Sequence, residues 1–135
     1  MAMDEQLLDR LRIRELLENY CDAVNQRDGS AWGRTWSTEA VWELPHLDID
    51  IRGRDAIVTA WEDAMKLFPF VNMMAQPGPI EFSGERATMR SYTMEVAVTQ
   101  EGKEIRPCGE YDDECIKEDG QWVFSRRTFR VLHGE

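Results

Sequence analysis

Apolar residues recur at helical spacing over residues 4–27. One face of this segment collects the side chains of Ile13, Leu17, Tyr20 and Val24. That spacing predicts a long amphipathic helix packed on a core. Asp4 is a suitable N-cap, and Gly29 suits the left-handed position that follows the last turn. We expect the rest of the chain to be arranged around this helix.

Two shorter helices are predicted next. Ser30 would cap a helix over residues 31–36, and residues 54–67 place apolar side chains on one face. Between them, residues 40–44 and 49–52 are strand candidates, separated by a break at proline 45.

From residue 80 onward, the pattern of apolar and polar residues changes from that of helices to that of strands. Residues 80–92 indicate two strands joined by a tight turn, and the strands continue over residues 88–99, 104–117 and 121–132. Prolines 69, 77 and 79 interrupt the preceding segment, which predicts a bent or edge strand. Helices followed by hairpins indicate one α+β domain over residues 1–135. Long antiparallel strands that wrap a helix need a curved sheet, which leaves a conical cavity for a small ligand.

Alternation along residues 88–99 assigns side chains to the two faces of that strand. Tyr92, Met94 and Val96 share one face, which we expect to point inward with Tyr92 beside the ligand. Glu95 has the opposite parity and is expected outside.

Composition narrows the possible partners. The 135 residues carry a net charge of −10, which argues against nucleic acid and anionic membranes as partners. No apolar run is long enough to span a membrane, and the charged start of the sequence is unlike a secretion signal. Three cysteines without CxxC spacing indicate free thiols in a reducing cytoplasm. Two isolated histidines and the lack of a glycine-rich phosphate loop predict neither a metal nor a cofactor.

Several segments, taken in order, resemble the SnoaL-like branch of the nuclear transport factor 2-like superfamily, which has a cystatin-like fold. They are YCDAVNQRD, WSTEAVWEL, GRDAI, IEFSGERATMRSY and GEYDDECIKEDGQWVFSRR. The resemblance implies a cone in which three N-terminal helices pack on a strongly curved, mixed but mostly antiparallel sheet around a pocket. It also implies a homodimer or higher homo-oligomer. Scytalone dehydratase and hexachlorocyclohexane dehydrochlorinase are members.

Those two members use an aspartate–histidine dyad in which the histidine removes a proton. Matching the motifs places Asn25 at the aspartate position and Met73 at the histidine position. An amide cannot carry the charge that supports an imidazolium, and a thioether has no proton to exchange. The resemblance therefore implies a pocket without the dyad mechanism.

The resemblance also implies a set of pocket residues. Arg127 matches an arginine that can stabilise developing negative charge. The expected ligand-binding residues are Asn25, Trp42, Met73, Tyr92, Tyr111, Leu17 and Phe68.

Three further residues are candidates for the chemistry, each with a structural alternative. Tyr20 could protonate a ligand oxygen or be a core tyrosine. Asp113 could replace the missing base, although an ion pair with an arginine on the neighbouring strand is favoured. His46 follows a proline near the mouth of the cone, where it could reach a ligand or be exposed. Asp22 lies away from the apolar helix face and is interpreted as a solvated charge.

We therefore expect a cofactor-independent lyase or isomerase that acts by dehydration, elimination or proton shift on a small hydrophobic or aromatic molecule. Arg127, Tyr20, Tyr111 or Tyr92 would bind oxygen atoms of the ligand, and Asp113 or His46 would be the substitute base. Two alternatives remain: a non-catalytic ligand-binding or interaction module, and a scaffold subunit akin to the β chain of aromatic-ring dioxygenases.

Overall fold

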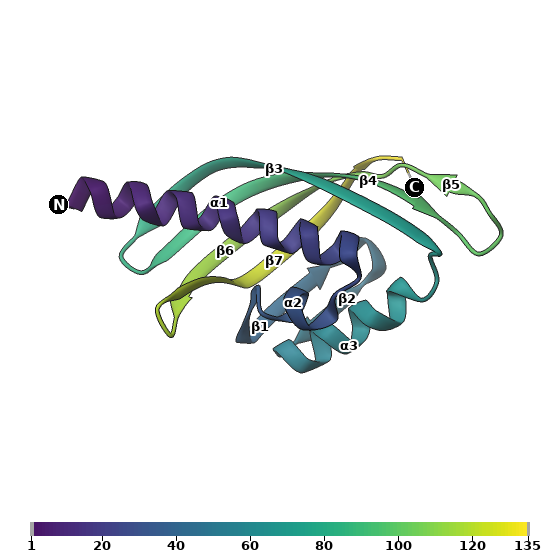
Figure 1. The fold of residues 1–135 in the computed structure, drawn as a ribbon, viewed down its shortest axis with the longest axis horizontal. Helices are drawn as coiled ribbons and strands as arrows, with labels where there is room; N and C mark the ends of the chain where they lie inside the picture. Colours follow the sequence, from purple (N-terminus) through teal and green to yellow (C-terminus); the bar gives the residue numbers. More distant parts are fainter. Residues whose placement is uncertain (1, 135) are drawn as a thin grey trace.

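The computed structural model describes residues 2–134 (Figure 1). In chain order the elements are α1 (Ala2–Gln26), α2 (Gly29–Gly33), β1 (Trp36–Leu44), the 3-10 helix η1 (Pro45–Leu47), β2 (Ile49–Arg52), α3 (Arg54–Met65), β3 (Phe70–Ser83), β4 (Arg86–Val98), β5 (Glu104–Ile105), β6 (Cys108–Glu118) and β7 (Gln121–His133). None of the helices within this range has the length and apolarity needed to cross a membrane.

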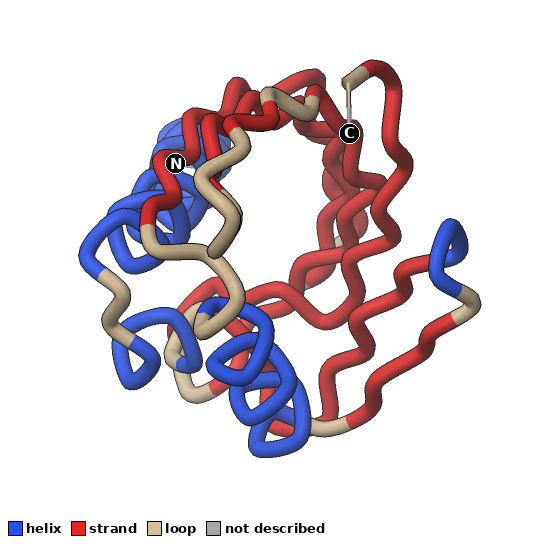
Figure 2. Tube along the Cα trace, turned by 90° about the vertical axis from the view of Figure 1, so that its right-hand side faces the viewer, coloured by secondary structure: helices blue, strands red, loops and turns tan. Residues whose placement is uncertain are grey.

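The strands form one seven-stranded sheet in the order β2-β1-β7-β6-β4-β3, with β5 paired to β4. The β1–β7 pair is parallel and the other pairs are antiparallel. Irregular register in β3 and β6 adds curvature, and Figure 2 shows the strands arching into a wall that the helices complete. The predicted α+β cone, with three helices on a curved mixed sheet, is confirmed.

Helix α1 lies along the concave side of the sheet and contacts β3 and β7 (Figure 1). Its predicted apolar face is confirmed, because Ile13, Leu17, Tyr20 and Val24 are each no more than 2% exposed. Burial of such a face supplies most of the stability of a helix in a protein.

Aromatic side chains fill the core between the helices and the sheet. The Trp32 ring stacks on Trp61 from α3, with 4.6 Å between ring centroids. Tyr20 packs edge-on against Phe124 of β7 at 5.7 Å. These contacts join α1, α2 and α3 to the sheet.

The predicted helix ends are partly wrong. Helix α1 begins at Ala2, so Asp4 is in its first turn and is not its cap. Arg27 takes the left-handed conformation expected of Gly29, with φ of 56°. Asp28, rather than Ser30, caps α2 by accepting a hydrogen bond from the backbone nitrogen of Ala31 at 3.0 Å. Gly29 instead opens α2, where a Cβ atom would displace the Glu62 side chain of α3.

Strand β3 is both an edge strand and irregular, as its prolines predict. It ends the strand order, and its pairing with β4 shifts between Pro77 and Ile80. Proline lacks the N–H that a central strand must donate, so this segment fits the edge.

Candidate functional site

Strand β4 presents the opposite face to the one predicted. Ser91 and Thr93 are buried and Glu95 is half-buried, whereas Tyr92 is 38% and Met94 is 54% exposed. Ser91 shows which side chains of β4 face inward, because its hydroxyl donates a hydrogen bond to Asp113 Oδ2 at 2.7 Å inside the core. Tyr92 therefore lies on the outer face, and its predicted role beside the ligand is not supported by its position.

Arg127 is buried in a polar cluster rather than open to a ligand. Its Nε donates to Asp113 Oδ1 at 2.6 Å, and its Nη2 donates to Ser91 Oγ at 3.0 Å. Neither member of the ion pair has an exposed side chain. Burial acts to lower the pKa of Arg127, but the Asp113 carboxylate, Tyr20 and Tyr111 together outweigh burial and keep the pKa above its ordinary value.

The favoured interpretation of Asp113, an ion pair with an arginine on the neighbouring strand, is confirmed. Both of its carboxylate oxygens accept hydrogen bonds inside the core. The ion pair between Arg127 and Asp113 supports the ring of Tyr111, because the Arg127 guanidinium is 3.7 Å from the centroid of that ring.

The rings of Tyr111, Tyr20 and Phe124 surround that guanidinium, and Trp42 contacts Tyr111. The indole Nε1 of Trp42 donates to the Tyr111 hydroxyl at 3.1 Å, and the Tyr20 ring is 4.5 Å from the guanidinium. Burial raises the pKa of both tyrosines, so both hydroxyls stay protonated. Tyr20 itself is only 2% exposed and serves mainly as core.

Asn25 and Met73, which the resemblance matches to the dyad, are neighbours. The Asn25 amide Nδ2 donates to the carbonyl oxygen of Met73 at 3.0 Å, and its Oδ1 accepts from the Met73 backbone nitrogen at 2.7 Å. The Met73 side chain is buried. The amide of Asn25 therefore fastens α1 to β3.

Glu95 is the residue that the sequence interpretation missed. It pairs with Met73 across β3 and β4, so it lies beside the residue that the resemblance matches to the histidine. Burial raises its pKa to about 6, and within residues 2–134 no hydrogen bond or charged neighbour offsets this effect. Alternation along β4 divides its side chains between two faces but does not say which face is concave. The pairing of Glu95 with buried Met73 distinguishes the two faces.

Tyr111 shares the concave face with Glu95. Tyr111 pairs with Ser91 across β6 and β4, and Glu95 is four residues farther along β4, so the two side chains have the same parity. Burial raises the pKa of the Cys21 thiol to about 11, against the opposing effect of the Arg127 guanidinium. Cys21 and Glu95 are both half-buried.

The other predicted residues are more dispersed. Leu17 is buried in the core and Phe68 packs against its border. His46 is exposed on η1, with its ring 5.5 Å from that of Phe129. Asp22 is exposed, as expected.

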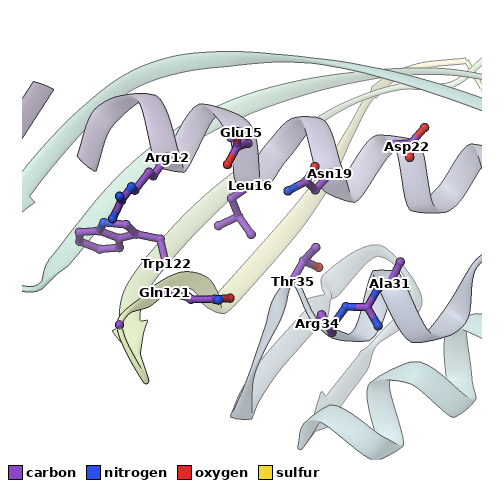
Figure 3. Close-up of a pocket in the computed structure, with 11 residues that line it drawn as sticks. Arg12, Glu15, Leu16, Asn19, Asp22, Ala31, Arg34, Thr35, Gln121 and Trp122 are labelled. Atoms are coloured by element: carbon purple, nitrogen blue, oxygen red, sulfur yellow. The ribbon is translucent and has the colours of Figure 1, made fainter. Parts of the chain in front are cut away.

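Two surface cavities are of interest. A cavity of about 640 Å³ lies between α1, α2 and the turn that joins β6 and β7, and Arg12, Asn19 and Arg34 are among the residues that line it (Figure 3). A second cavity of about 310 Å³ adjoins the sheet at Tyr92 and Met94, and its lining also includes Ala75, Thr93 and Gly109. Among residues 2–134, no group of three or more histidine, cysteine or acidic side chains is placed to hold a metal.

Comparison with known proteins relates this geometry to a family. The SnoaL-like domain family matches residues 5–128. Rv3472 from Mycobacterium tuberculosis, a protein of unknown function solved as a variant, is 30% identical, with 97% of this chain and 76% of that chain covered and a TM-score of 0.84. No curated protein sequence matches the chain.

Two more distant structures share the fold. A protein provisionally named scytalone dehydratase, from Novosphingobium aromaticivorans, is 21% identical, with 98% and 90% of the two chains covered and a TM-score of 0.90. LinA, a hexachlorocyclohexane dehydrochlorinase, is 20% identical, with 99% and 92% covered and a TM-score of 0.90. The family match over residues 5–128 and the 30% identical relative show that this chain belongs to the SnoaL-like domain family.

Proposed function

We propose that the protein is a cofactor-independent lyase or isomerase acting on a small hydrophobic or aromatic molecule, with Glu95 as its base. The observation that carries this proposal is the state of the Glu95 carboxyl group. It is half-buried on the concave side, lacks a compensating partner among the described residues, and has a pKa raised to about 6. Perturbed carboxyl groups of this kind are typical of functional sites.

A carboxylate with this pKa is suited to proton transfer near neutral pH. It is largely ionised at pH 7, and it is a stronger base than an ordinary glutamate. Glu95 would take a proton from a C–H group, and the C–H electron pair would form a new double bond. In an elimination the leaving group departs with its bonding pair; in an isomerisation the proton returns at another carbon. The hydroxyl of Tyr111, which stays protonated because its pKa is raised, would support an oxygen atom that gains charge.

The proposal does not use the dyad positions. The Asn25 amide is engaged with the Met73 backbone through both its oxygen and its nitrogen. It therefore has no role in the proposed proton transfer beyond holding α1 against β3.

Elimination of 5-nitrobenzisoxazole tests the proposal, because this flat aromatic molecule reports C–H proton removal by a coloured product. We expect the wild-type rate to rise with pH through about 6 and then level off, as Glu95 ionises. The Glu95→Gln variant should lose the rate enhancement over free acetate. Glu101→Gln, which alters an exposed glutamate in a turn, should keep this enhancement. Equal rates for wild type and Glu95→Gln, or a wild-type rate no higher than that of free acetate at the same concentration, would exclude Glu95 as a base.

A non-catalytic ligand-binding module is the second candidate. The observation that favours it is the structural use of Asn25, since a dyad position has become an anchor for the helix. This candidate predicts that hydrophobic molecules bind equally well to wild type and Glu95→Gln, with no proton transfer in either.

A further inference from the structure

Short side chains line the concave sheet between Glu95 and Tyr111. Thr93 of β4 is paired with Ala75 of β3 on one side and with Gly109 of β6 on the other. Glu95 is two residues farther along β4, and Tyr111 is two residues farther along β6, so both share the face of this row. The row Ala75–Thr93–Gly109 is thus a floor with a carboxylate on one side and a phenol on the other.

The hydroxyl of Thr93 lacks a partner. Thr93 is 5% exposed, and its Oγ1 is shielded from solvent without a hydrogen bond to any residue in the described range 2–134. An unpaired buried hydroxyl costs free energy, and valine would fill the same volume without that cost. A hydroxyl at this position is therefore explained better by a ligand atom than by packing.

The ring of Phe129 covers this hydroxyl. A side chain at Gly109 would collide with the Phe129 ring and would approach Thr93 Oγ1 to 2.9 Å, so the ring and the hydroxyl adjoin the same point. Phe129 is half-buried. The centroid of its ring is 4.9 Å from that of Tyr111 and 5.5 Å from that of exposed His46. The ring therefore contacts both buried Tyr111 of the sheet and the exposed 3-10 helix η1.

We propose that Thr93 is a ligand-binding residue and that Phe129 covers it until a ligand displaces the ring. The ligand class is a flat apolar molecule that carries a hydroxyl or carbonyl oxygen. Ala75, Gly109 and the displaced ring contact its faces, and Thr93 Oγ1 hydrogen-bonds its oxygen. This inference rests on the proposed function only in placing the ligand on the concave side.

A matched pair of probes, 2-naphthol and 2-methylnaphthalene, isolates the hydrogen bond because the two molecules have nearly the same shape. Affinities for wild type and variants would be measured by quenching of tryptophan fluorescence. The quantity of interest is the ratio of the affinity for 2-naphthol to that for 2-methylnaphthalene. Thr93→Val should lower this ratio by roughly three- to tenfold, the effect of one hydrogen bond, while the affinity for 2-methylnaphthalene stays within about twofold.

Two controls separate this effect from packing. Thr93→Ser retains the hydroxyl and should retain the wild-type ratio. Thr88→Val changes a threonine on the same strand that faces outward, and it should also leave the ratio unchanged. Urea unfolding should show that Thr93→Val is at least as stable as wild type.

An unchanged ratio in Thr93→Val, an equal loss of affinity for both probes, or failure of both probes to bind wild type would each overturn the inference. Binding of 2-naphthol involves no C–H proton transfer, so this result is independent of the elimination assay. A lowered ratio together with an inactive wild type would support Thr93 and favour the ligand-binding module.

Discussion

The side chain of Asn25 pairs with the backbone of Met73 as a neighbouring strand would, donating to its carbonyl oxygen at 3.0 Å and accepting from its nitrogen at 2.7 Å. This relationship depends on the amide. A carboxylate could accept from the nitrogen but could not donate to the carbonyl oxygen.

Asn25→Asp should therefore destabilise the protein. We expect the free energy of unfolding at pH 7 to fall by about 1–3 kcal/mol, because a buried carbonyl loses its donor. The loss should shrink at low pH, where a protonated carboxyl can donate again. Urea denaturation would measure both values. Asn19→Asp, an exposed position on the same helix, is the control and should change stability little. Wild-type stability of Asn25→Asp at pH 7 would contradict the anchoring role.

Removal of Arg127 should affect folding first. Arg127→Met leaves the fully buried Asp113 carboxylate uncompensated, and such changes cost about 3–5 kcal/mol. Replacing Asp113 by Leu in the same protein should recover much of the loss. Thermal and urea unfolding would measure both.

The control for that prediction is the ion pair between Arg130 and Glu110, in which the arginine side chain is 68% exposed. Arg130→Met should change stability by no more than about 0.5 kcal/mol, because surface pairs contribute little. Similar losses at positions 127 and 130 would argue against a structural role of the buried pair.

The raised pKa of Glu95 predicts a pH-dependent stability. The folded protein holds this proton more tightly than the unfolded chain, with a pKa of about 6 against an ordinary value of 4.5. Glu95 therefore destabilises the fold as pH rises through the window from about 4.5 to 6, by about 2 kcal/mol in total. Glu95→Gln should be more stable than wild type by that amount at pH 8 and equal to it at pH 4. A variant that gains nothing at pH 8 would show that the carboxylate is well solvated.

The thiols should differ in reactivity. At pH 8, a thiol whose pKa is raised to about 11 by burial is ionised to about a thousandth. Cys21 should thus react slowly with Ellman's reagent in the native protein, and the buried Cys115, whose pKa burial also raises, more slowly still. All three thiols should react at once in urea. Rapid native labelling of a Cys108→Ser protein would contradict this order.

Local patterns in the sequence predicted the elements well. The 3.6-residue period identified the buried face of α1 because that face is continuous over three turns. Prolines 77 and 79 identified an edge strand because proline removes a backbone donor. Caps were predicted less well. Only Arg27 and Asp28 separate α1 from α2, and Asp28 is already the cap of α2, so a connection this short leaves no room for separate signals.

The site was harder to predict because it depends on which face of β4 is concave. Tyr92 and Met94 are more apolar than Ser91 and Thr93, so hydrophobicity favoured the wrong face. Ser91 and Thr93 face the concave side because they pack beneath side chains from other strands, such as Arg127, which donates a hydrogen bond to Ser91. Such contacts between distant segments are not visible in the local alternation, and Glu95 was missed for the same reason.

The irregular segment of β3 has a consequence for how copies of the protein meet. Prolines 77 and 79 cannot donate a backbone hydrogen bond from the edge of the sheet. The opposite edge, β2, has only four residues and carries Asp50 and Arg52. Both edges are poor templates for a strand from another chain, so the protein should resist edge-to-edge aggregation even when it is concentrated.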